Sequence, residues 1–475
     1  MAQAATFPQG YRMPSQAQSA AAAQVAARGV SNVQGLGFTL LLCFLFMIFS
    51  RVFDMYLSRF HIPGFSERLM AVVVLVTGSF WRPFQTRIGK TLLWLTVWMV
   101  LGVPFSVWRV NSLQQLATQW WASIVVFVAV AGLITDYQQY RRAAMVLAVA
   151  IFTLSMFCLH FGTMETGRLF MANRSRFANP NEMAQAMLMG IPFWLAMCKR
   201  WSSLPGKVLA GAVMLVMVYI IAKTGSRGAL ISFAALYLVI LYHSSAIGRA
   251  GLMLAGSLAM CAALAFLPST LKERYKTLFA EDKPEAEANT TDDRLLVSAV
   301  TSTASREHLL RQSLILTARH PIFGVGVGQF PTAENTLAIS QGKRKGSWLG
   351  THNSYMQMAS ETGVIGAFLF ISVFFLSMKT THSIYRATRD HPELKAIATQ
   401  AEALFLSLLC LAITDLSIHA AYTMLLPVLA GMTIALEYTT RPLLVEAQRR
   451  RSALPATTVR QVFPGRAPAA GYARA

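Results

Sequence analysis

The chain has 475 residues, of which 55% are hydrophobic and 13% are charged, and its formal net charge is +21. Soluble domains carry about 25% charged residues, so this composition and a mean hydropathy of +0.47 exclude an ordinary soluble protein. Most lysines and arginines lie in short loops beside apolar runs, which argues against nucleic-acid binding and is typical of cytoplasmic loops of membrane proteins.

Twelve apolar runs follow one another along the chain and predict membrane-spanning helices, because backbone groups in lipid must be paired within the segment. The runs lie near 36–53, 69–81, 90–107, 118–135, 143–160, 183–198, 207–222, 228–242, 251–267, 356–378, 399–417 and 420–438. We therefore expect an all-α polytopic membrane protein with about twelve transmembrane helices. The five cysteines all lie in apolar runs without CxxC spacing, so neither a metal cluster nor a disulfide framework is predicted.

The polar segments between and beside these runs predict the domain organisation. A disordered tail (1–34) is expected before helices one to nine (35–267), and a large, partly helical loop domain (268–355) before helices ten to twelve (356–438). A second disordered tail, rich in Arg, Ala and Pro, is expected over 439–475. Basic residues gather in alternate connections, so the positive-inside rule predicts that both termini are cytoplasmic and that the large loop faces the periplasm or cell exterior.

Arginines also occur on the outward side, where the same rule predicts few of them. They are Arg168, Arg174 and Arg176 between helices five and six, Arg227 in a tight GSRG turn between seven and eight, and Arg306, Arg311 and Arg319 in the large loop. Guanidinium groups held close to the bilayer match phosphate oxygens in bidentate geometry. The pattern indicates an anionic lipid-linked partner, although snorkelling at the interface explains Arg168 or Arg319 taken alone equally well.

The large loop contains several segments of its own. Leu271–Phe279 fits a short amphipathic helix, residues 281–294 are acidic and expected to be irregular, and Ser305–His320 predicts a helix that lies on the bundle. Arg306 and Arg311, five residues apart, would differ by roughly 140° around that helix. The GVGVG run at 324–328 lacks nucleotide-binding spacing and indicates tight backbone packing. The adjacent Asp292 and Asp293 fit a solvated stretch better than a metal site.

His352 differs from the other histidines because it precedes an apolar run and shares the outward side with the arginines. An imidazole there can accept a proton at neutral pH, and Asn353 could orient it or bind a sugar hydroxyl. A base beside an anion-binding arginine cluster suggests that a hydroxyl attacks a carbon whose leaving group is a lipid-linked phosphate or pyrophosphate. The arginines would then stabilise the departing charge.

The stretch HNSYMQMASETGVIG resembles the signature of the O-antigen ligase and polymerase superfamily, with His352, Asn353, Gly363 and Gly366 at the matching positions. The preceding SREHLLRQSLILTARHPIFGVGVGQF resembles the family's Arg-led helix that runs into His-Pro-x-x-Gly-x-Gly, although Leu310 replaces the usual Trp. FANPNEMA at 177–184 and GSRGAL at 225–230 resemble two further family segments. The closest overall likeness is to the O-antigen ligases.

That resemblance implies a metal-independent, inverting glycosyltransferase of lipopolysaccharide biosynthesis in the bacterial inner membrane, without a cofactor and with a periplasmic active site. The donor would be O-antigen on undecaprenyl pyrophosphate, and the acceptor a sugar hydroxyl of lipid A–core. His352 would be the base, and Arg227 and Arg306 would neutralise the pyrophosphate. Weaker substrate-binding candidates are Arg311, Arg174, Arg176, Asn181 and Asn353.

Three alternatives remain. An O-antigen polymerase and a protein O-oligosaccharyltransferase would share donor, fold and motifs and differ only in the acceptor. A lipid-linked glycan transporter would explain helices and arginines without catalysis, but it would tend to place charges within its spans near the midplane. Asp415 and His419, near the end of a predicted span, are the nearest candidates for such charges.

Overall fold

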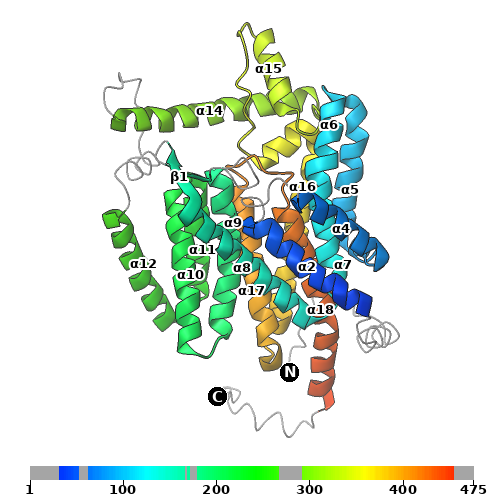
Figure 1. Cartoon of the computed structure of the whole chain (residues 1–475), viewed down its shortest axis with the longest axis vertical. Coiled ribbons are helices and arrows are strands. Elements are labelled where there is room, and N and C mark those ends of the chain that lie inside the picture. The colour runs from blue at the N-terminus through cyan, green and yellow to red at the C-terminus, as the bar shows by residue number, and fades with distance from the viewer. Residues whose placement is uncertain (1–31, 53–61, 166–167, 172–178, 267–290, 454–475) are drawn as a thin grey trace, which may run out of the picture.

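The computed structural model describes residues 32–52, 62–165, 168–171, 179–266 and 291–453, and most of this part of the chain is helical (Figure 1). The helices are α2 (Asn32–Ser50), α4 (Ile62–Val76), α5 (Arg87–Gly102), α6 (Arg109–Gln115), α7 (Trp121–Leu133), α8 (Tyr137–Phe161), α9 (Pro180–Arg200), α10 (Leu204–Lys223), α11 (Arg227–His243), α12 (Ala246–Phe266), α14 (Thr291–Arg319), α15 (Phe330–Ser340), α16 (Ser354–Thr388), α17 (Lys395–Thr414) and α18 (Leu425–Ala453). Short helical turns are η2 (Pro83–Gln85), η3 (Val103–Phe105), η4 (Leu116–Trp120) and η5 (Pro392–Leu394).

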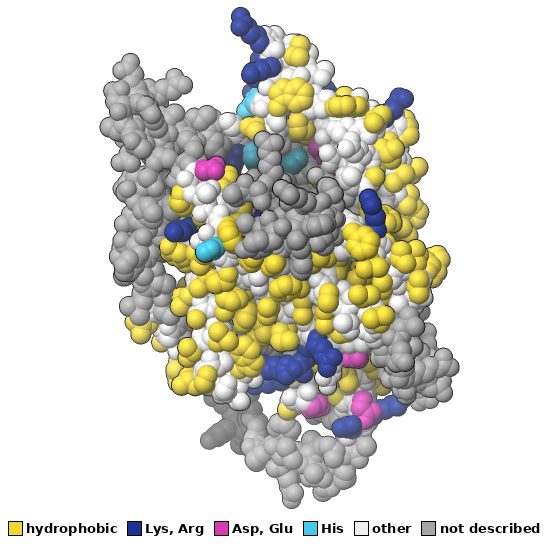
Figure 2. Space-filling view, viewed as in Figure 1, with side chains coloured by type: hydrophobic (Ala, Val, Ile, Leu, Met, Phe, Trp, Pro, Cys, Tyr) yellow, Lys and Arg dark blue, Asp and Glu magenta, His cyan; other side chains and the backbone are white. Residues whose placement is uncertain are grey.

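Each of the twelve predicted apolar runs overlaps one of these helices, which supports a polytopic helical membrane protein. In the described part of the chain, six helical segments are long and apolar enough to cross a membrane: Arg87–Phe105, Arg109–Leu133, Tyr137–Phe161, Leu204–Lys223, Ser354–Thr388 and Pro392–Thr414. The expectation of about twelve crossings stays a prediction. Figure 2 shows the matching surface, in which hydrophobic side chains cover the middle of the molecule and Lys and Arg gather toward its two ends.

The described residues are mostly helical, as predicted, and β1 (Gly162–Glu165) and β2 (Arg168–Met171) add one short antiparallel hairpin, with Gly162 opposite Met171. Two expectations about secondary structure need correction. The stretch predicted to be irregular up to residue 294 is helical from Thr291 onward. The predicted C-terminal tail is helical as far as Ala453, since Glu437–Arg441 and Glu446–Arg450 pair four residues apart in the favourable order.

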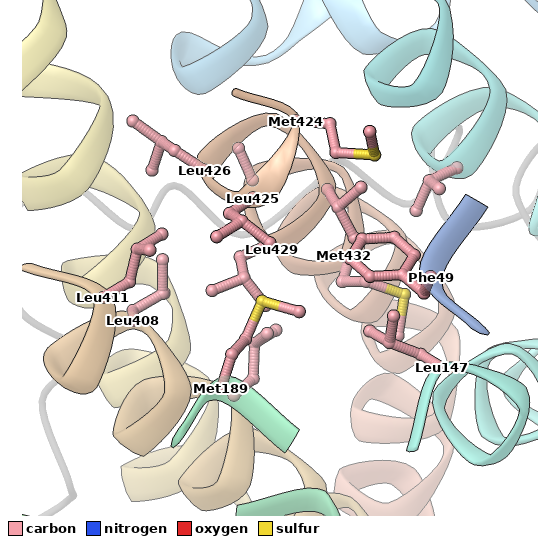
Figure 3. Close-up of a cluster of buried hydrophobic side chains, with 14 of the residues drawn as sticks. Phe49, Leu147, Met189, Leu408, Leu411, Met424, Leu425, Leu426, Leu429 and Met432 are labelled. Atoms are coloured by element: carbon pink, nitrogen blue, oxygen red, sulfur yellow. The ribbon is translucent and has the colours of Figure 1, made fainter. Parts of the chain in front are cut away.

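The predicted helix at Leu271–Phe279 and most of the predicted N-terminal tail lie outside the described residues, although 32–34 already belong to α2. Inside the bundle, buried Leu and Met side chains from α9, α17 and α18 meet Phe49 of α2 and Leu147 of α8 (Figure 3). Phe49, Leu147 and Met189 are all fully buried. This apolar centre packs together helices that are far apart in sequence. As a result, the segments that connect these helices meet at the ends of the bundle.

The second half of the large loop forms a layer across one end of the bundle, where α14 lies crosswise and α15 projects outward (Figure 1). We call this the site end; it also carries the hairpin 162–171, the turn 224–226 and the connector 415–424 between α17 and α18. The GVGVG segment attaches this layer to the bundle. Val325 N donates to Ser360 O (2.8 Å), and Val107 N donates to Val325 O (3.0 Å). The predicted tight backbone packing of this run is therefore confirmed.

Candidate active site

Three of the helices that begin at the site end are capped there by a polar side chain. Asn179 caps α9, Ser226 caps α11 and Asn353 caps α16, in each case by accepting a hydrogen bond from a backbone N–H of the first turn. Such caps satisfy only part of the free N–H groups at a helix start. Because a helix N-terminus carries a partial positive charge, three of them at one end of the bundle favour an anionic ligand there.

The connector 415–424 brings these three helix starts together. Gln185 of α9 donates from Nε2 to Asp415 Oδ1 (2.7 Å), and Ser354 of α16 donates from its backbone N to Asp415 O (2.8 Å) and from Oγ to Ile418 O (2.8 Å). Gly228 of α11 approaches so closely that a Cβ there would lie 1.9 Å from Ser417 Oγ. The connector therefore contacts the first or second turn of each helix.

The GSRG turn that presents Arg227 needs both of its glycines. Gly225 adopts a φ of +60°, which disfavours residues with a Cβ, and Gly228 makes room for Ser417. Arg227 is the first residue of α11 and is half-buried at the site end. The turn thus places Arg227 next to Gly228, which contacts the connector.

Arg168 links the start of α9 to the C-terminal end of α10 through its guanidinium group. Its Nε donates to Thr224 O (2.8 Å), and one terminal nitrogen donates to Asn181 Oδ1 (2.7 Å). Thr224 precedes the GSRG turn, and Asn181 lies in the first turn of α9. Interface snorkelling does not describe this side chain, because it crosslinks the β-hairpin to α9 and α10.

Two arginines act electrostatically on the imidazole of His352. Burial lowers its pKa below the usual value, and the charges of Arg306 and Arg168 lower it further. Arg306 of α14 and Arg168 of the hairpin therefore both influence the imidazole electrostatically, and the role of the three side chains stays a prediction. His352 also has a φ of +51°, an unusual backbone conformation for a residue with a Cβ. A neutral, half-buried imidazole among arginines is suited to accept a proton.

His419 supports the loop that carries His352. Its Nδ1 accepts from Thr351 N (3.2 Å) and lies 3.0 Å from Thr351 Oγ1. Its ring also packs on Gly350, where a Cβ would lie 2.6 Å from the imidazole. Burial and the neighbouring His352 lower the pKa of His419 to about 4, so it is neutral at physiological pH. Asp415 and His419 both lie in the connector at the site end, not within a described helix.

Glu361 is a buried carboxylate within α16 that sequence reasoning did not single out. It accepts hydrogen bonds from Gly328 N (2.9 Å), Phe330 N (3.1 Å) and the Tyr422 hydroxyl (2.6 Å). The helix kinks beside it at Gly363, whose φ is +75° and where a Cβ would lie 2.0 Å from Ile322 O. Glu361 therefore connects the large loop, α16 and the connector. An acidic residue inside an apolar run was the signal that could have found it.

The remaining candidates have differing surroundings. Arg306 is half-buried and Arg311 is exposed, as their spacing on α14 predicts. Asn353 uses its Oδ1 to accept from Tyr355 N and Met356 N, both at 3.0 Å. Arg174 and Arg176 lie outside the described residues.

Residues 212–371 match the model of a protein family described as O-antigen ligase. The resemblance predicted from the sequence is confirmed. The match covers about one third of the chain and contains Arg227, Arg306, His352 and Glu361. A comparison with curated proteins gives no match. Members of the O-antigen ligase family are glycosyltransferase-like enzymes that act as ligases or polymerases. The matched range joins the turn before α11, the layer formed by α14 and α15, and the kinked start of α16, which together provide most of the site.

Proposed function

We propose that the protein is an O-antigen ligase that acts on the periplasmic face of the bacterial inner membrane. It transfers O-antigen polysaccharide from undecaprenyl pyrophosphate to a sugar hydroxyl of lipid A–core, with inversion and without a metal. The observation that carries this proposal is the position of His352, a half-buried imidazole whose pKa is lowered by burial and by the charges of Arg306 and Arg168.

In this reaction the acceptor hydroxyl oxygen attacks the anomeric carbon of the donor sugar. His352 takes the hydroxyl proton, a new glycosidic bond forms, and the bond from the anomeric carbon to the pyrophosphate oxygen breaks. Arg227 and Arg306 hold the departing pyrophosphate, and the three helix N-termini at the site end add to the positive potential. Asn181 orients Arg168 at the donor side of the site.

The decisive experiment is transfer in vitro with purified protein, undecaprenyl-pyrophosphate-linked glycan and lipid A–core in the presence of EDTA. We expect glycan on lipid A–core with wild-type protein and none with His352→Ala. Lengthening of the glycan on its own carrier would assign a polymerase. Transfer only to an added protein acceptor would assign a protein O-oligosaccharyltransferase, and loss of activity in EDTA would contradict the metal-independent mechanism.

A further inference from the structure

The segment 341–353, which we call the strap, returns from the outer end of α15 to the start of α16. Figure 1 shows α15 projecting beyond the bundle and the strap descending beside it. Three consecutive cations, Lys343, Arg344 and Lys345, lie at the beginning of the strap and are all exposed. Figure 2 shows Lys and Arg side chains at the outermost point of this end. The strap contains no Asp or Glu, so it presents a concentrated positive charge.

The backbone of the strap is fixed beneath these cations. Ser347 N donates to Glu334 Oε2 (2.8 Å), and Gly346 N donates to Asn335 Oδ1 (2.8 Å). Gly346 sits so close to α15 that a Cβ would lie 2.4 Å from Glu334 Oε2. Glu334 is only 1% exposed, so its carboxylate anchors the backbone and leaves the cationic tip facing outward.

Trp348 lies between the cationic tip and His352. It is 56% exposed and has a φ of +56°, so the chain holds a large aromatic side chain outward at a backbone cost. Two residues further on, Gly350 packs on His419 and ends the exposed stretch. The backbone is held before Trp348 by Ser347 N and after it by Gly350. The exposed indole therefore offers a flat face on which the apolar face of a sugar ring can pack.

We propose that the strap binds an anionic acceptor glycan, with carboxylate or phosphate groups on Lys343–Lys345 and a sugar ring on Trp348. This inference rests on the proposed function, because the strap leads to His352, the group that takes the acceptor's proton. The seven residue-to-residue steps from Lys345 to His352 span at most about 25 Å, so a single oligosaccharide can contact both ends. Figure 1 shows that α15 and the strap project beyond the ends of the bundle helices, which favours a soluble glycan over a lipid headgroup as the ligand of the cationic tip.

The test compares binding of two defined oligosaccharides to the full-length protein in phosphatidylcholine nanodiscs. Tetragalacturonate supplies four carboxylates, and maltotetraose is neutral. We expect Lys343→Gln/Arg344→Gln/Lys345→Gln to weaken tetragalacturonate binding at least tenfold and to leave maltotetraose binding unchanged. Trp348→Ala should weaken both. The matched control, Arg142→Gln/Lys207→Gln/Lys395→Gln, removes three exposed cations from the first two turns of α8, α10 and α17 and should change neither affinity.

Several results would overturn the proposal. One is equal tetragalacturonate affinity in wild type and the strap triple variant; another is the same loss in the control variant. Disappearance of the strap-dependent binding in phosphatidylglycerol nanodiscs would assign the cations to lipid headgroups. Equal melting temperatures of the variants check that the fold is intact. Transfer to lipid A–core separates this inference from the proposed function: an acceptor KM that is the same in wild type and the strap triple variant would contradict this inference alone, whereas a wild-type protein that transfers to no acceptor would contradict the proposed function itself.

Discussion

The Nδ1 atom of His419 lies 3.0 Å from the hydroxyl oxygen of Thr351, the residue directly before His352. The same nitrogen accepts from Thr351 N, so the buried imidazole is a fixed acceptor for the loop that carries the proposed base. Because the pKa of His419 is about 4, this acceptor persists across the physiological range. His419 is therefore a positioning residue.

We expect His419→Asn to retain much of the transfer activity, because an amide oxygen can replace Nδ1 as the acceptor for Thr351 N. His419→Phe keeps the ring but offers no acceptor, so we expect kcat to fall at least tenfold while KM for the donor changes little. The measurement is steady-state transfer for both variants at matched melting temperature. Equal activity of the Asn and Phe variants would show that Thr351 does not depend on this hydrogen bond.

The electrostatics of His352 predict the pH dependence of transfer. A general base must be neutral, so kcat/KM should rise with pH through the pKa of His352, which lies below 6.5 because of burial and of Arg306 and Arg168. Arg306→Gln removes one positive charge. The removal of this charge stabilises the protonated imidazole and therefore raises the pKa of His352. We therefore expect the acidic limb of the pH profile to move to higher pH in this variant, in addition to any loss of rate. A limb that stays in place would remove Arg306 from the surroundings of His352.

The sequence predicted the elements of this fold better than their contacts. Apolar runs located the helices because lipid demands internally paired backbone, and the glycines of GVGVG indicated close packing. Arg168 was not distinguished from an interfacial arginine, since its partners are a backbone carbonyl and an amide from segments 13 and 56 residues away. The support of Thr351 by His419 depends on a tertiary approach across 68 residues, which periodicity and spacing do not encode.

A substitution of Arg168 can distinguish whether this side chain acts through its two directed hydrogen bonds or only through its positive charge. Arg168→Lys keeps the charge but cannot reproduce the separate bonds to Thr224 O and Asn181 Oδ1. We expect kcat/KM for the lipid-linked donor to fall about tenfold, by the loss of roughly one charge-assisted hydrogen bond. Arg319→Lys, at the exposed end of α14, is the matched control and should be silent. Equal kcat/KM values of the two variants would show that Arg168 acts only as a positive charge at the membrane interface.

Glu361 and Gly363 predict where the fold is most sensitive to substitution. Glu361→Ala leaves the buried Phe330 N and the partly buried Gly328 N without their acceptor, which costs about 3 kcal/mol. Gly363→Ala forces a Cβ into Ile322 O at a positive φ and should also lower the melting temperature by several degrees. Gly211→Ala is the matched control, because its Cβ meets nothing within 4 Å on α10 and alanine favours the helix by about 0.5–1 kcal/mol. Thermal unfolding in detergent measures the melting temperature of each of the three variants relative to that of the wild type. A melting temperature unchanged by Glu361→Ala would mean that the large loop does not depend on this carboxylate for its attachment to α16.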